Sequence, residues 1–177
     1  MTRLIIRLRA GVLFFVLILA AAPLWGASQE TKVVSTEWLQ KNLSQSDIRI
    51  VDMRNNVGDY WQNHIPGAVY MNPEVLRLAD HGVPVKLMPV KALTVMLGEM
   101  GVDPKTLVLV YTEKGDFKAP YLVWALDFLG HERAVVMEGG FAKWQKEGLP
   151  VTQDYPKIVT KNYPLPKMLR REVRASL

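Results

Sequence analysis

Residues 107–130, "LVLVYTEKGDFKAPYLVWALDFLG", decide the fold of this protein. The apolar run that ends at Tyr111 is typical of a buried β-strand. Pro120 stands in the first turn of a following helix, where its missing N–H costs nothing, and Gly130 stands where that helix would end. A strand that enters a helix through a short loop predicts a βα unit, and Thr112 is the first residue of the loop.

The rest of the chain repeats this alternation of strands and helices. Further strands are predicted at residues 48–52, 68–71 and 133–138. Helices are predicted at residues 35–43, 57–64, 89–100, 119–129 and 141–147. Connections this short allow only βα units, so the sequence predicts an α/β fold with one parallel sheet and helices on both faces. In such sheets ligands bind beyond the carboxyl ends of the strands. Here those ends carry residues 52–54, 72, 112–118 and 138–140.

Residues 1–28 have the pattern of a secretory signal peptide. Three arginines precede the sixteen-residue apolar run "AGVLFFVLILAAAPLW", and small residues follow it. We therefore expect cleavage after Ser28 and a periplasmic or secreted bacterial protein. The alternative is an uncleaved N-terminal membrane anchor, because the run approaches the ~20 residues that span a bilayer.

Composition excludes several kinds of function. The 177 residues include no cysteine, which excludes disulfides, thiolate metal sites and a cysteine nucleophile. The three histidines lie in different segments, so no metal site is predicted, and Gly139 and Gly140 lack the wider motif of a dinucleotide site, so no cofactor is predicted. Residues 29–156 carry 13 basic and 16 acidic side chains, which does not indicate a nucleic-acid partner.

Five separated blocks resemble one known family. They are "IVDMR", "HIPGA", "VLVYTEKG", "ALDFLGH" and "VMEGGFAKWQKEGLPV", in this order over residues 34–151. In order and spacing they resemble the rhodanese homology domain of sulfurtransferases. The resemblance implies a rhodanese-like α/β domain over residues 29–152, with a central five-stranded parallel sheet and helices on both faces.

The resemblance also implies where catalysis would occur. Active members carry a cysteine directly after the strand, in a loop C-x-x-G-x-R, and this cysteine accepts a sulfane sulfur from thiosulfate or mercaptopyruvate as a persulfide. Here the loop keeps Gly115, has Thr112 in place of the cysteine, and has Lys118 one position later than the arginine. A threonine hydroxyl cannot form a stable persulfide, so we predict no catalytic residue in this chain.

A narrower resemblance is to the N-terminal, non-catalytic module of two-domain thiosulfate or 3-mercaptopyruvate sulfurtransferases. Residues 153–177 are rich in proline and basic residues, and resemble the linker that leads in those proteins to a second module. The resemblance implies a pseudoenzyme that acts as a scaffold for a catalytic sister module, in the same or another chain. The alternative is sulfurtransferase activity that a second, cysteine-bearing module completes.

Residues of the degenerate loop allow one more interpretation. Its backbone amides and the start of the next helix could form a cradle for a small sulfur-containing anion. The candidate residues are Thr112, Glu113, Lys114, Gly115, Asp116, Phe117 and Lys118. The two carboxylates of this loop would repel an anion and favour a purely structural loop. For Asp52, Arg54 and His64 we predict structural polar contacts near the loop.

Overall fold

The computed structural model describes residues 32–170. Residues 1–31, which include the predicted signal peptide, and residues 171–177 lie outside the described part. Within residues 32–170, none of the helices has both the length and the apolar character that a membrane span requires.

Five parallel strands form the central sheet. They are β1 (Val33–Val34), β2 (Ile48–Asp52), β3 (Val69–Tyr70), β6 (Leu107–Tyr111) and β7 (Ala134–Met137), in the order β1-β7-β6-β2-β3. In the β2–β6 register Asp52 lies opposite Tyr111, so the residues after both strands meet at one edge of the sheet. The predicted α/β architecture, with a central five-stranded parallel sheet, is confirmed.

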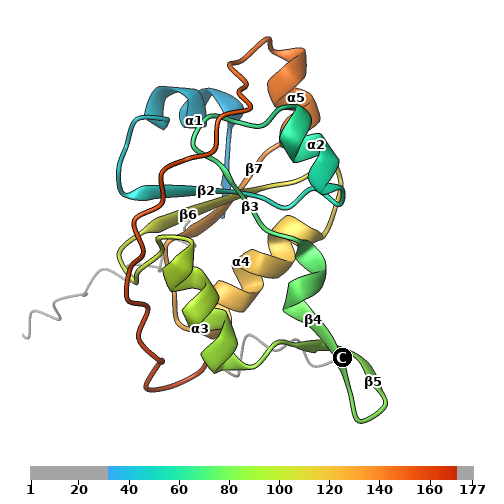
Figure 1. Ribbon diagram of the computed structural model, residues 1–177, viewed down its shortest axis with the longest axis vertical. Helices are drawn as coiled ribbons and strands as arrows, with labels where there is room; N and C mark the ends of the chain where they lie inside the picture. Colours follow the sequence, from blue (N-terminus) through green and yellow to red (C-terminus); the bar gives the residue numbers. More distant parts are fainter. Residues whose placement is uncertain (1–31, 171–177) are drawn as a thin grey trace, which may run out of the picture. The chain divides into compact units, whose positions relative to one another are not determined.

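Helices cover both faces of this sheet, as Figure 1 shows. On one face lie α1 (Thr36–Asn42) and α5 (Gly140–Lys146), and on the other lie α3 (Val90–Glu99) and α4 (Lys118–Phe128). The short helix α2 (Val57–Gln62) precedes β3. α1 begins as predicted, because the Ser35 hydroxyl accepts a hydrogen bond from the backbone N–H of Trp38.

Each face of the sheet has its own apolar core, because neighbouring residues of a strand point to opposite faces. Val51, Val108 and Val110 pack with α3 and α4. Ile50 and Leu109 pack on the other face, around Trp144. The near-continuous apolar runs of β2 and β6 follow from this burial on both sides.

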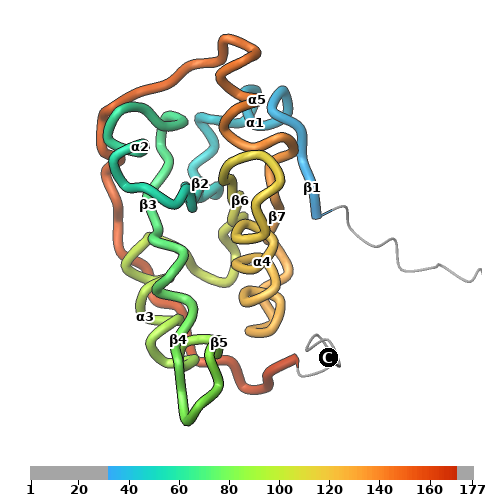
Figure 2. Tube along the Cα trace, turned by 90° about the vertical axis from the view of Figure 1, so that its right-hand side faces the viewer, coloured from blue at the N-terminus to red at the C-terminus, as the bar shows by residue number. Residues whose placement is uncertain are grey.

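One connection differs from the prediction that all connections form βα units. After the 3₁₀ helix η1 (Pro73–Leu76), the strands β4 (Arg77–Asp80) and β5 (Val83–Leu87) form an antiparallel hairpin. Figure 2 shows it extending from the end of η1. Its turn places His81 and Gly82 at positive φ, as a tight hairpin requires. The short strand β1 was not predicted either.

Residues 153–170, here called the C-terminal strap, contain no helix or strand, yet they lie against the domain (Figure 1). The backbone N–H of Lys161 donates a hydrogen bond to the carbonyl oxygen of Gly98. A Cβ added at Gly98 would lie 2.5 Å from the carbonyl oxygen of Lys161, so the strap lies close to the backbone of α3 here. Arg170 forms ion pairs with Asp127 and Glu132. The described part of the predicted linker is thus attached along its length, while its role as a connector to a second module stays a prediction.

Tyr163 joins this strap to the core beside α3 and α4. Burial raises the pKa of Tyr163 to about 12, so its hydroxyl stays protonated and donates to Nδ1 of His131 at 3.1 Å. Burial lowers the pKa of His131, and Nε2 of its neutral ring donates to the carbonyl oxygens of Thr106 and Arg133. One buried imidazole therefore ties the strap to two loops of the domain.

Truncation of Tyr163 should measure how firmly the strap is attached. We expect Tyr163→Ala to lower the free energy of unfolding by about 2–4 kcal/mol through lost apolar burial. We expect Tyr163→Phe to cost about 1 kcal/mol, because Nδ1 of His131 loses its donor. Urea unfolding of the purified chain measures both values, and two neutral substitutions would show that the strap is a detached linker.

Acidification should weaken the same attachment. Because the folded-state pKa of His131 is lowered, its contribution to stability is present above the ordinary value of about 6.5 and is lost as the pH falls. We expect unfolding free energy to drop between pH 7.5 and pH 5.5, and to drop less in His131→Asn. His81→Asn, at an exposed position, is the matched control and should behave as the wild type. An equal drop in His131→Asn would contradict this role.

Candidate functional site

The loop between β6 and α4 begins at Thr112, the position at which the family resemblance places the nucleophile. Thr112 is only 2% exposed, and its hydroxyl donates to the carbonyl oxygen of Glu113 at 3.1 Å. The carbonyl oxygen of Thr112 accepts a hydrogen bond from the N–H of Phe141 at 2.8 Å. The Thr112 side chain is therefore bound within its own loop and is not presented to a substrate.

Gly140 holds this loop against the start of α5. A Cβ at Gly140 would lie 2.3 Å from the Thr112 carbonyl oxygen and 3.1 Å from the Lys114 nitrogen, and its φ of +61° also favours glycine. Gly139, at φ +75°, is the N-terminal cap of α5. The glycine pair thus serves a tight turn and a close backbone contact.

The carboxylate of Asp116 lies at the start of α4, where it accepts a hydrogen bond that an external anion could otherwise accept. Its Oδ1 accepts the backbone N–H of Lys118 at 2.9 Å, and its Oδ2 lies 2.8 Å from the Lys118 ammonium. Burial would raise the pKa of Asp116, but hydrogen bonds from Lys118 outweigh it and hold the pKa below its ordinary value. The group is therefore ionised at neutral pH and occupies the position that an external anion would need.

Glu113 adds negative character to the loop. Burial raises the pKa of its carboxyl, and the nearby carboxylates of Asp59, Asp52 and Asp116 raise it further, against the effect of Arg54. Lys118 is already paired with Asp116, while Lys114 is exposed. The electrostatics of residues 112–118 therefore disfavour the predicted anion cradle.

Asp52 and Arg54 form a buried ion pair behind the loop. The guanidinium donates from Nε and Nη2 to Asp52, with the shortest contact at 2.7 Å, and Nη2 also donates to the carbonyl oxygen of Asn63. The Tyr111 hydroxyl donates to the same carboxylate at 2.7 Å. Arg54 lies 3.9 Å from the centre of the Phe141 ring, and Asp52 raises its pKa although burial alone would lower it.

His64 lies between α2 and the strap. Its Nδ1 lies 2.8 Å from the carbonyl oxygen of Tyr60, and its Nε2 lies 3.2 Å from that of Asp154. The ring is buried and stacks on Tyr60, with 3.8 Å between the centroids. These contacts with backbone oxygens place His64 in packing and hydrogen bonding, not in an open site.

A cavity of about 750 Å³ lies beside the loop, and α5 supplies residues that the sequence analysis did not single out. It is lined by Lys114, Gly115, Glu138, Gly139, Ala142, Lys143, Lys146 and Glu147. The Lys143 ammonium donates a hydrogen bond to the Glu138 carboxylate, with 3.0 Å between Nζ and Oε2, and this ion pair raises the pKa of Lys143. In the sequence, Lys143 and Lys146 follow the glycine pair at helical spacing, and this pattern could have indicated that α5 lines a cavity beside the loop. Its charged groups provide neither a thiol nor an imidazole.

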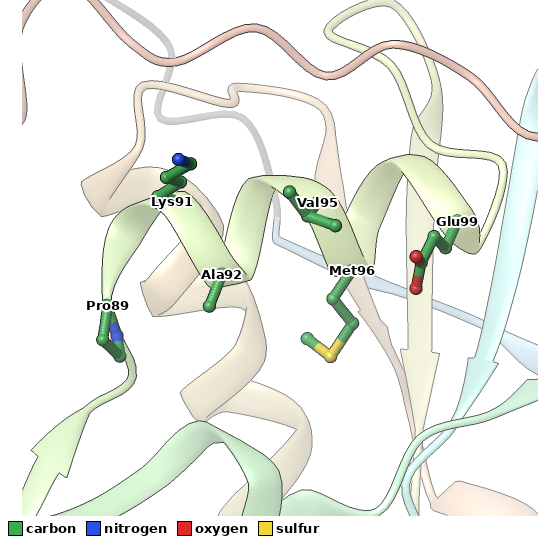
Figure 3. A pocket seen from close by; sticks show the side chains of 6 residues that line it. All are labelled: Pro89, Lys91, Ala92, Val95, Met96 and Glu99. Atoms are coloured by element: carbon green, nitrogen blue, oxygen red, sulfur yellow. The ribbon is translucent and has the colours of Figure 1, made fainter.

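Another cavity, of about 470 Å³, lies on α3 (Figure 3). Figure 3 shows Lys91 and Glu99 at opposite ends of the helix, with Val95 and Met96 between them. Because these two charged side chains are far apart, they cannot act together on one substrate atom as a base and an acid.

Residues 32–170 also contain no cluster of three or more side chains suited to hold a metal ion.

Comparison with known proteins agrees with this geometry. The family model described as "Rhodanese-like domain" matches residues 35–147. The chain is 32% identical over 155 residues to a putative thiosulfate sulfurtransferase of Synechococcus elongatus, covering 84% of this chain and 48% of that protein. It is 33% identical over 130 residues to the 3-mercaptopyruvate sulfurtransferase of Escherichia coli K12, covering 67% and 46%.

The structural comparison extends to a solved member. The crystal structure of the 3-mercaptopyruvate sulfotransferase SseA from Escherichia coli matches with a TM-score of 0.67 at 29% identity, over 76% of this chain and 55% of that one. The chain spans about half the length of these curated relatives. Because the family model covers residues 35–147 and the sheet has the same fold, the chain belongs to the rhodanese-like domain family.

Proposed function

We propose that this chain is a non-catalytic rhodanese-like module of an exported, sulfurtransferase-type protein, and that it docks on a catalytic sister module. One observation carries the proposal: Thr112 occupies the nucleophile position in a sequence without cysteine. Sulfane transfer by this family needs a thiolate, and the sulfur of methionine is a thioether that cannot replace it. The burial of Thr112 supports the same conclusion.

The intact surroundings of the loop support a scaffold role. The Asp52–Arg54 pair, Tyr111 and the Gly140 contact keep the strand ends ordered although the nucleophile is absent. The curated relatives are about twice as long as the matched region, which leaves room in those proteins for a second module. A module that has kept its shape without its reactive group is suited to supporting a neighbour.

An apolar surface next to the loop is a candidate for this docking. Phe117 is 58% exposed, and the Arg77 guanidinium at the base of the hairpin lies 5.5 Å from the centre of its ring. In the β4–β5 register Arg77 pairs with Leu87, so Val85, two residues before Leu87, shares the hairpin face with Arg77, and Val85 is about half exposed. We call Phe117 and Val85 the hairpin surface. Apolar side chains gathered on a surface in this way mark interaction sites.

The location remains a proposal that the sequence supports. The charged, apolar and small-residue segments of residues 1–28 favour export to the periplasm or cell exterior. Contact with a membrane would then occur only through an uncleaved leader.

The alternative is an enzyme that a second module completes, and the half-length match to sulfurtransferases favours it as the second candidate. This second candidate requires a cysteine-bearing module encoded with this chain, and DNA sequence around its gene would reveal one. Absence of any such module there would contradict it. Binding of a sulfur-containing anion in the loop is less well supported, because Asp116 already fills that position.

Installing a thiol should not restore sulfur transfer. In Thr112→Cys the new side chain would be buried beside Glu113, which favours the protonated thiol over the thiolate. We expect its turnover of thiosulfate with cyanide to stay within about tenfold of the Thr112→Ser control, which has no thiol. The wild type should show no turnover above solvent. Restoration by several orders of magnitude in Thr112→Cys would show that the loop is still competent and has lost only its nucleophile.

Polar substitutions on the hairpin surface should weaken docking. We expect Phe117→Ser and Val85→Ser each to lower the affinity for the cysteine-bearing module encoded with this chain about tenfold, as loss of a buried apolar contact does. Val95→Ser, on the exposed face of α3, is the matched control and should bind as the wild type. Calorimetric titration of the purified modules measures the affinities, and an equal effect of all three substitutions would contradict this surface.

A further inference from the structure

A polar cavity of about 370 Å³ lies between the start of β2 and the C-terminal strap. It is lined by Leu43, Gln45, Ser46, Ile48, Arg49, Ile50, Gly67, Pro156, Lys157, Val159 and Lys161. The cavity is near the amino ends of the strands, whereas the loop 112–118 follows the carboxyl end of β6. It is therefore separate from the site described above.

Positive charge dominates this cavity. Arg49, Lys157 and Lys161 line it, and no acidic residue does so among residues 32–170. Lys161 is partly neutralised by Asp103 at 3.2 Å. The structure records no ion pair for Arg49 or Lys157 within the described part of the chain, so their charges face the cavity without an internal counterion.

Arg49 is the least satisfied of these cations. Its Nε is the one buried side-chain nitrogen or oxygen in the described residues that lacks a hydrogen-bond partner. Burial also lowers the pKa of its guanidinium. The position is fixed by close packing, because a Cβ on Gly101 would lie 2.7 Å from Nη2 of Arg49. A partly buried guanidinium without a partner is costly, and a charged acceptor would remove that cost.

We propose that this cavity binds a small doubly charged tetrahedral oxyanion, of the phosphate or sulfate class, through Arg49 and Lys157 with support from Lys161. The planar guanidinium donates to two oxygens of such an anion, and an ammonium contributes a compact charge. Gln45 and Ser46 line the cavity and carry further N–H and O–H donors. Because residues 156–161 form one wall, the bound anion also fixes the strap to β2.

Titration with inorganic phosphate tests this site on the purified full chain, with sodium chloride holding the ionic strength constant. We expect saturable binding by calorimetry, with sulfate competing and chloride failing to compete. Arg49→Gln should weaken binding at least about tenfold, and Lys157→Gln about threefold. Lys114→Gln, in the degenerate loop, is the matched control and should leave binding unchanged.

A second measurement distinguishes a binding residue from a structural one. Without phosphate, Arg49→Gln should unfold at the same or a higher temperature than the wild type, because it removes an unpaired, half-buried charge. With phosphate, amide hydrogen exchange in residues 157–161 should slow in the wild type but not in Arg49→Gln. Lys157 is exposed, so Lys157→Gln keeps the test valid if Arg49→Gln fails to fold.

Three outcomes would overturn the proposal. The first is no saturable binding at millimolar phosphate. The second is weak binding that Arg49→Gln and Lys157→Gln leave unchanged, which would indicate an adventitious ion only. The third is loss of binding in Lys114→Gln, which would place the anion in the loop 112–118. Each of these results leaves the scaffold proposal intact, because that proposal depends on Thr112 and not on Arg49.

Discussion

The buried ion pair between Asp52 and Arg54 is the interaction on which the carboxyl edge of the sheet depends. It connects β2 to β6 through the Tyr111 hydroxyl, to the end of α2 through the Asn63 carbonyl oxygen, and to α5 through the Phe141 ring. Loss of one partner would leave the other charged and buried, which costs about 3–5 kcal/mol. The pair is therefore needed for the fold whether or not the adjoining loop performs chemistry.

Shape and chemistry are separable in the adjoining loop. Its position depends on backbone contacts, from the Phe141 N–H to the Thr112 carbonyl oxygen and from Gly140 to residues 112–114, and neither uses the side chain at position 112. Asp116 supplies an internal anion at the start of α4. A rhodanese-like loop can thus keep its path after the nucleophile is lost, and the domain is free to serve as a scaffold.

The amino-acid sequence predicted those helices, strands and loops that are marked by residues close together in the chain. β2, β6 and α4 carry long apolar runs ended by glycine or polar residues, and the position of Thr112 followed from the motif around Gly115. The hairpin at residues 77–87 was missed because its strand residues are exposed or only partly buried, so no buried apolar run marks these strands in the sequence. The contacts of the strap were missed because Tyr163 meets His131 only in the folded chain. The cavity at Arg49 likewise depends on residues more than a hundred positions apart.

Intact-protein mass spectrometry of the purified wild-type chain, after incubation with thiosulfate and gel filtration, tests the central claim most directly. If this domain has kept the rhodanese fold without its sulfur chemistry, the mass stays unchanged. A stable gain of one sulfur atom, removed again by cyanide, would contradict the account.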